Sequence, residues 1–143
     1  MPAPQDPFDD VGLLLSIASA IAVRNINLSL EPQGLRARAF SVLGMAAAGG
    51  DVTQRNVADA LNLNPSQVVA LVDDLESEGL VARRSHTSDR RARVISATDQ
   101  GVAYFAEARR VADEALERSL HGLDAAQRDT LRELLQKLIA NAQ

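Results

Sequence analysis

The sequence predicts a mainly α-helical fold that contains one small β-hairpin. Apolar residues recur at spacings of three and four along most of the 143 residues, which is the pattern of helices with one buried face. Between residues 80 and 97 the pattern changes to that of two short strands around a polar tip. Apolar residues make up 46% of the chain, enough to form a core, so we expect it to fold.

Two helices are predicted in the first third of the chain. Residues 7–30 carry a helical apolar stripe, and the sequence Glu-Pro-Gln-Gly at residues 31–34 ends it. A second helix is predicted at about residues 36–48, where the pair Gly49-Gly50 terminates it. The first stripe comprises Val11, Leu14, Leu15, Ala18, Ile21, Ala22 and Leu28.

Two short helices joined by a tight turn are predicted next. Thr53 can cap the first of them. The second helix has three start signals, because Asn64 can cap it, Pro65 suits its first position and Gln67 completes a capping box. Gly79 is expected to end this second helix.

A β-hairpin and two further helices complete the chain. Residues 80–86 and 91–97 are predicted as strands, and Thr98 can cap a long helix that ends near Leu120. Leu123-Asp124 is expected to start the last helix. On the long helix we expect inward positions at Val102, Phe105, Ala106, Val111, Ala112 and Leu116. The stripe of the last helix comprises Leu131, Leu134, Leu135, Leu138 and Ile139.

The charge distribution is uneven. The net charge of the chain is −4, yet the segment from residue 83 to residue 93 holds five arginines and a single acid, Asp89. These arginines are Arg83, Arg84, Arg90, Arg91 and Arg93. A local basic patch of this kind favours a nucleic-acid partner even when the whole chain is acidic.

The order of elements over residues 53–98 is that of a winged helix-turn-helix. In this arrangement the N-terminal turn of the second helix enters the major groove of double-stranded DNA, where each base pair shows a distinct pattern of donors and acceptors. We therefore expect Asn64, Ser66 and Gln67 to contact base edges. The backbone and minor-groove contacts are expected from Arg55, Arg84, Arg90 and Arg91. Strand alternation turns Arg83 and Arg93 toward the apolar face, so we do not include them.

The hairpin region resembles the signature of the MarR family of bacterial transcriptional regulators. The run Leu-Glu-Ser-Glu-Gly-Leu-Val-Ala-Arg-Arg at residues 75–84 carries part of the resemblance. The D-x-R element of the family matches Asp89 and Arg91, and its T-x-x-G helix start matches Thr98 and Gly101. The order of helices is also similar over nearly the whole chain.

The resemblance implies a homodimer with two DNA-binding lobes, usually a repressor. It implies that residues 1–34 and 99–143 form a helical dimerisation region and residues 35–98 the DNA-binding region, within one compact domain. It also implies that Arg91 approaches the minor groove and that Asp89 orients it. Small anionic or phenolic effectors often bind such proteins where the two regions meet.

The second helix departs from the family pattern because its later part is acidic. Asp73, Asp74, Glu76 and Glu78 lie there, so we expect DNA binding to depend on the hairpin and to weaken steeply with salt. The acidic charge also leaves an alternative open, a winged-helix module that binds protein without sequence-specific DNA binding. Stacking partners for an effector are limited to Phe8, Phe40, Tyr104 and Phe105.

Other classes of function are disfavoured. The chain has no cysteine and only two histidines, and we find no nucleophile–base pair, glycine-rich phosphate loop or metal-ligand spacing. We therefore expect neither an enzyme nor a bound metal or cofactor. No run approaches the roughly 18 uninterrupted apolar residues of a membrane helix, and the start does not resemble a signal peptide. A cytoplasmic location without membrane contact is the resulting expectation.

Overall fold

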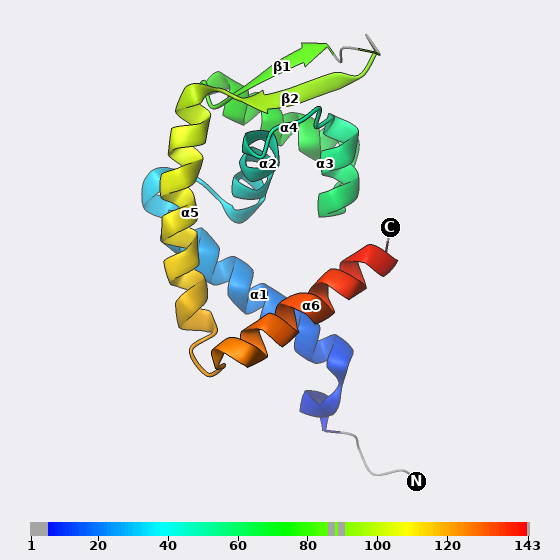
Figure 1. Ribbon diagram of the computed structural model, residues 1–143, viewed down its shortest axis with the longest axis vertical. Helices are drawn as coiled ribbons and strands as arrows, with labels where there is room; N and C mark the ends of the chain where they lie inside the picture. Colours follow the sequence, from blue (N-terminus) through cyan, green and yellow to red (C-terminus); the bar gives the residue numbers. More distant parts are fainter. Residues whose placement is uncertain (1–5, 86–87, 89–90, 143) are drawn as a thin grey trace.

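The computed structural model describes residues 6–85, 88 and 91–142, and it confirms the predicted fold class. Helices α2, α3 and α4 and the hairpin β1–β2 form a lobe, shown at the top of Figure 1. The long helix α5 runs from this lobe to the region of α1 and α6 (Figure 1). The described chain therefore consists of a lobe that carries the hairpin and of a helical arm.

Helix α1 spans Val11–Leu30 and lies mostly in solvent. Asp10 caps it by accepting a hydrogen bond from the Leu13 N–H group, at 2.7 Å. The short 3-10 helix η2 (Glu31–Gln33) and Gly34, whose φ of 69° is left-handed, end it as predicted. By length and composition alone, Val11–Gln33 would also be able to cross a membrane, a test that soluble core helices and signal sequences pass too.

The core of the lobe lies between α2 (Ala37–Ala47), α3 (Gln54–Leu61), α4 (Pro65–Ser77) and the hairpin. The predicted caps are confirmed, since Thr53 and Asn64 each form a capping box with the residue three positions later. The turn between α3 and α4 uses Asn62 in the left-handed region, with φ of 52°. The fully buried side chains include Leu30, Val42, Leu43, Val57, Val68, Val72, Leu80, Val81, Val94 and Ile95.

The hairpin pairs β1 (Val81–Ser85) with β2 (Arg93–Ala97) in antiparallel register, with Arg83 opposite Ile95. The returning strand begins two residues later than predicted, because residues 91 and 92 form a turn and a bend. The backbone N–H of Ile95 donates to the Val52 carbonyl oxygen at 2.8 Å, and Thr53 bridges Val94. These contacts fix the start of α3 beside β2.

Helix α5 spans Asp99–Ser119, and its buried face differs from the predicted one. The buried residues are Gly101, Ala108, Ala112 and Ala115. Of the predicted inward positions, Ala112 is buried and Phe105 and Val111 are half-buried, whereas Val102, Ala106 and Leu116 are exposed. That part of the prediction is wrong for the single chain, because α5 packs closely against α1 and the lobe through its small residues.

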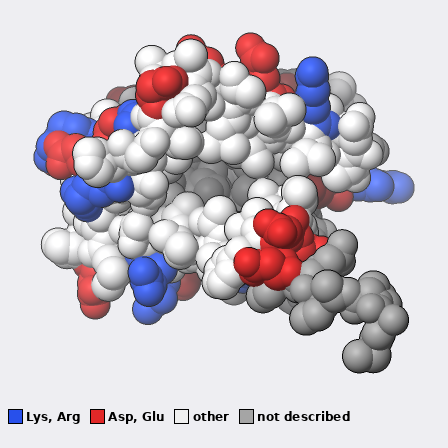
Figure 2. Space-filling view, turned by 90° about the horizontal axis from the view of Figure 1, so that it is seen from below, with Lys and Arg blue, Asp and Glu red and all other residues white. Residues whose placement is uncertain are grey.

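Helix α6 spans Ala125–Asn141 and buries none of its residues in the single chain. The helix starts where predicted, and Asp124 caps it in a capping box with Gln127. Of the predicted stripe, Leu131 is half-buried, and the others, Leu134, Leu135, Leu138 and Ile139, are exposed. Seen from below, the molecule is hollowed near its centre and shows few charged side chains except toward its rim (Figure 2).

Candidate nucleic-acid interface

The first turn of α4 is exposed and is organised by its own side chains. Asn64 Oδ1 accepts hydrogen bonds from the Gln67 N–H at 2.9 Å and from the Ser66 hydroxyl at 2.7 Å. Gln67 Oε1 accepts from the Asn64 N–H at 3.1 Å. The three residues predicted to contact bases are therefore brought together at one helix start.

This network limits what the three side chains can offer a base. An amide that reads adenine uses both its oxygen and its nitrogen. Asn64 Oδ1 already accepts two hydrogen bonds, whereas Gln67 Oε1 accepts one and keeps a second lone pair. Base reading by Asn64, Ser66 and Gln67 stays a prediction, and a bidentate contact by Asn64 would require one of its two hydrogen bonds to break.

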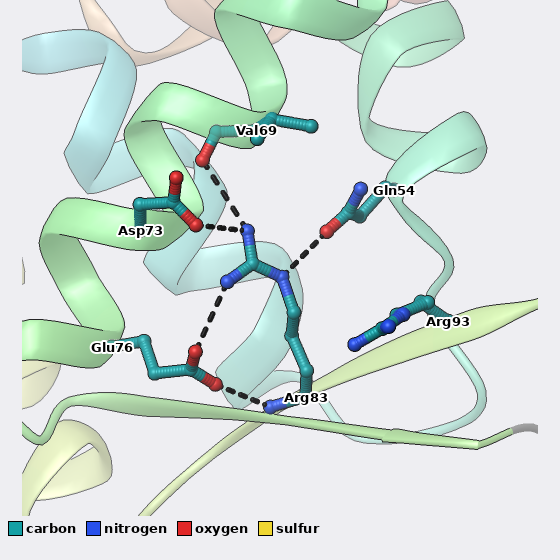
Figure 3. A pocket seen from close by; sticks show the side chains of 6 residues that line it. All are labelled: Gln54, Val69, Asp73, Glu76, Arg83 and Arg93. Atoms are coloured by element: carbon teal, nitrogen blue, oxygen red, sulfur yellow. Dashed lines mark hydrogen bonds and ion pairs between the residues drawn. The ribbon is translucent and has the colours of Figure 1, made fainter.

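Arg83 extends from β1 toward two helices and contacts residues on both (Figure 3). Its Nε donates to Gln54 Oε1 of α3 at 2.7 Å. Its two terminal nitrogens lie 2.6 Å from Asp73 Oδ1 and 3.0 Å from Glu76 Oε1, both on α4. One of them also donates to the Val69 carbonyl oxygen at 3.3 Å. Arg83 thus joins β1, α3 and α4.

The Glu76 carboxylate is the most constrained of these acids. It accepts from the backbone N–H of Arg83 at 2.9 Å as well as from the guanidinium. The backbone hydrogen bond first, and then the side-chain bond and charge of Arg83, hold the pKa of Glu76 below its ordinary value of 4.5. The Arg83 contacts therefore favour the charged form of this carboxylate.

Arg93 and Arg83 line the same open cleft of about 590 Å³, together with Gln54, Val69, Asp73 and Glu76. Figure 3 shows Arg93 beside Gln54, on the hairpin side of the cleft. The predicted exclusion of Arg93 rested on strand alternation, yet its side chain is exposed. Arg93 therefore places a positive charge at the edge of this cleft.

The other described residues that were predicted to act in DNA binding do not take part in the contacts of Arg83. Arg84 is 53% exposed, with its guanidinium 3.6 Å from Asp51, so it can turn toward a phosphate at little cost. Arg55 is exposed on the first turn of α3, and Arg91 is exposed at the base of the hairpin tip. Asp89 and Arg90 lie outside the described residues. The DNA roles of these residues stay predictions.

A second, more apolar cleft lies between α2 and α5. It measures about 810 Å³, and its walls include Phe40 and Phe105, whose rings stack with centroids 5.1 Å apart. Gly44 allows this approach, because a Cβ atom there would lie 2.9 Å from the Phe105 ring. Arg109 lines the same cleft and pairs with Asp113 at 2.9 Å. The cleft combines aromatic walls with a cation, as an aromatic anion would require.

Sequence reasoning missed the structural role of Arg83. Alternation correctly placed its side chain on the inner face of the hairpin, but nothing in the sequence pattern paired it with Gln54 or with the acids of α4. Among the described residues, no group of three or more His, Cys, Asp or Glu side chains could hold a metal ion.

Comparisons with known proteins agree on one family. A model of the MarR family matches residues 33–92. The HTH-type transcriptional repressor MdtR of Bacillus subtilis is 34% identical over 79 residues, which are 55% of this chain and 51% of MdtR. The match thus spans about half the length of that curated relative.

Two solved structures are similar over almost their whole length. A MarR-family transcriptional regulator from Rhodococcus sp. RHA1 is 38% identical with a TM-score of 0.90, covering 94% of this chain and 96% of that one. CouR from Rhodococcus jostii RHA1, solved with p-coumaroyl-CoA bound, is 39% identical with a TM-score of 0.86. The alignment with CouR covers 94% of this chain and 95% of that one.

Proposed function

Because the chain belongs to the MarR family of transcriptional regulators, we propose that it is a homodimeric, ligand-responsive repressor of a pseudo-palindromic operator. The observation that carries the proposal is the lobe itself. An exposed, capped helix start on α4 is joined through Arg83 to a hairpin that bears Arg84 and Arg91. Such a lobe can place α4 in the major groove while the hairpin contacts the neighbouring backbone or minor groove.

A homodimer would cover the apolar arm. The apolar residues exposed on α1 include Leu13, Leu14, Leu15, Ile17 and Ile21, and those exposed on α6 include Leu134, Leu135, Leu138 and Ile139. An exposed apolar surface of this extent marks an interaction site in soluble proteins. Burial against a second copy also explains the apolar character of α1 without a membrane. A two-fold dimer then reads half-sites about one helical turn apart.

The effector site we propose is the cleft between α2 and α5. CouR, a relative of similar length, binds p-coumaroyl-CoA. In this chain, Phe40 and Phe105 offer stacking surfaces and Arg109 offers a charge. An aromatic carboxylate or a thioester of one fits that chemistry, and the cleft adjoins α5, which connects lobe and arm.

The proposed regulator acts in the cytoplasm and is not an enzyme. Its DNA contacts are Asn64, Ser66, Gln67, Arg55, Arg84, Arg90 and Arg91, with Asp89 orienting Arg91.

Selection of bound duplexes from a random pool at a stated salt concentration tests the proposal. We expect a pseudo-palindromic consensus, because a two-fold dimer presents two equal recognition helices. A parallel selection without protein controls for amplification bias. Absence of enrichment would contradict the proposal and favour the protein-binding module that the acidic charge leaves open.

A further inference from the structure

We infer that Arg83 is a positioning residue, whose guanidinium holds the hairpin against α4 and so sets DNA affinity without touching DNA. This inference rests on the proposed DNA-binding function. It concerns a residue that the predicted set of contacts leaves out.

The geometry of Arg83 uses the planar fork of a guanidinium. Its Nε is directed to Gln54 on α3, and its two terminal nitrogens are directed to Asp73 and Glu76 on α4. Asp73 and Glu76 lie three positions apart and so share one face of the helix. A lysine ammonium is a single point and cannot span these partners at once.

Burial separates Arg83 from the exposed arginines. Its side chain is 12% exposed, whereas that of Arg84, the next residue on the strand, is 53% exposed. The nitrogens of Arg83 are directed at protein acceptors from three side chains and one carbonyl group. Its donors are therefore committed within the lobe.

The same contacts account for the acidic half of α4. Two of its three carboxylates, those of Asp73 and Glu76, are paired with Arg83. A phosphate near the hairpin therefore meets two carboxylates of which the guanidinium offsets one negative charge. Without the guanidinium, both carboxylates would repel DNA and would no longer anchor the strand.

The competing interpretation is that Arg83 contacts a phosphate directly. The two roles predict different results for Arg83→Lys, which keeps the charge but removes the fork. A phosphate contact survives this substitution, because a lysine also neutralises a phosphate, so affinity and its salt dependence should stay near those of wild type. A positioning contact is lost, so affinity should fall while the slope of log affinity against log salt stays unchanged.

The experiment measures three quantities for wild type, Arg83→Lys and a matched control, Arg110→Lys. Arg110 also bridges two carboxylates, Glu107 and Glu114, but lies exposed on α5. The quantities are affinity for the selected duplex across salt, the melting temperature, and amide hydrogen exchange in β1 and β2. Melting temperature shows whether each variant is folded.

For Arg83→Lys we expect about a tenfold or greater loss of affinity, an unchanged salt slope and faster exchange of the strand amides. Arg110→Lys should match wild type in all three. Affinity within twofold of wild type, or a slope lowered by about one, would overturn the inference. If Arg83→Lys does not fold, Glu76→Gln, which removes one partner, replaces it with the same criteria.

Failure of the proposed function gives a different result. If wild type binds no duplex, the DNA-binding proposal fails, and the inferred effect on affinity fails with it. The exchange data then decide only whether Arg83 holds the hairpin in place. Unchanged exchange in Arg83→Lys would refute that part as well.

Discussion

The hydroxyl group of Tyr104 on α5 donates a hydrogen bond to the carbonyl oxygen of Gln33, in the segment that ends α1. This bond ties the helical arm to the lobe at the point where η2 leads into α2. Tyr104 is half-buried, and burial, followed by the nearby negative charge of Glu78, raises the pKa of its phenol above 10.0.

Tyr104→Phe should therefore lower the free energy of unfolding by about 1 kcal/mol, the usual net value of one hydrogen bond. The raised pKa of Tyr104 adds a pH signature. Its contribution is fully present below about pH 10 and is lost as the pH rises through the folded-state pKa. Denaturant unfolding of wild type and Tyr104→Phe between pH 8 and 11 measures this contribution. If the free energy of unfolding changed with pH equally in the two proteins, the prediction would be contradicted.

Gly101→Ala should be strongly destabilising. A Cβ atom at residue 101 would lie 1.9 Å from the Leu80 carbonyl oxygen, which is backbone and cannot move away alone. We expect a loss of about 3 kcal/mol, at the upper end for overpacking. Gly122→Ala is the matched control, because a Cβ there meets nothing within 4 Å. Equal melting temperatures for the two variants would refute the close approach.

The stability of the protein at acidic pH should depend on the contact between Glu76 and Arg83. Because the pKa of Glu76 is lowered in the folded state, its stabilising contribution is present above about 4.5 and is lost as the pH falls through the folded-state value. Glu76→Gln should thus be less stable than wild type near pH 7, with the difference narrowing toward pH 3. Chemical denaturation along this range is the measurement. If the difference in free energy of unfolding between Glu76→Gln and wild type stayed constant with pH, the charge of the Glu76 carboxylate would not contribute to stability.

Arg91→Ala should abolish or severely weaken duplex binding and lower the salt slope by about one, if Arg91 meets the phosphate backbone at the minor groove. Fluorescence anisotropy at several salt concentrations measures both quantities. Arg110→Ala, on the exposed side of α5, should bind like wild type. Unchanged binding by Arg91→Ala would remove Arg91 from the proposed interface.

Leu138→Glu should shift the protein from dimer to monomer in sedimentation analysis, because it places a charge in the apolar stripe of α6. Leu138 is 54% exposed in the single chain, so the substitution does not disturb the core of the lobe. Gln136→Glu adds the same charge to an exposed position outside the stripe. A dimer of unchanged affinity would show that α6 is not part of the interface.

The local elements were predictable because their signals are local. Thr53, Asn64 and Thr98 each cap a helix through an atom within three residues, as predicted, and Asp124 does so at the predicted start of the last helix. The signals for a cap act over one turn, so the sequence contains them in full.

The packing of α5 and the role of Arg83 were not predictable in the same way. Periodicity favoured large apolar residues as the buried face of α5, yet the buried residues are alanines and Gly101, which packs against the Leu80 backbone. The hydrogen bond from Arg83 to Gln54 joins two residues that lie 29 positions apart in the sequence. Which distant residues come into contact depends on the tertiary arrangement. The residue pattern of a single strand does not contain that information.

Helix α5 has a mechanical consequence for any effector bound beside it. It begins two residues after β2 ends and continues without interruption for 21 residues, or about 31 Å, before α6. A rigid rod of that length converts a tilt of about 5° at one end into a displacement of about 3 Å at the other. That distance is comparable to a hydrogen-bond length, so a small molecule that tilts α5 could move the hairpin out of reach of DNA without any part of the lobe unfolding.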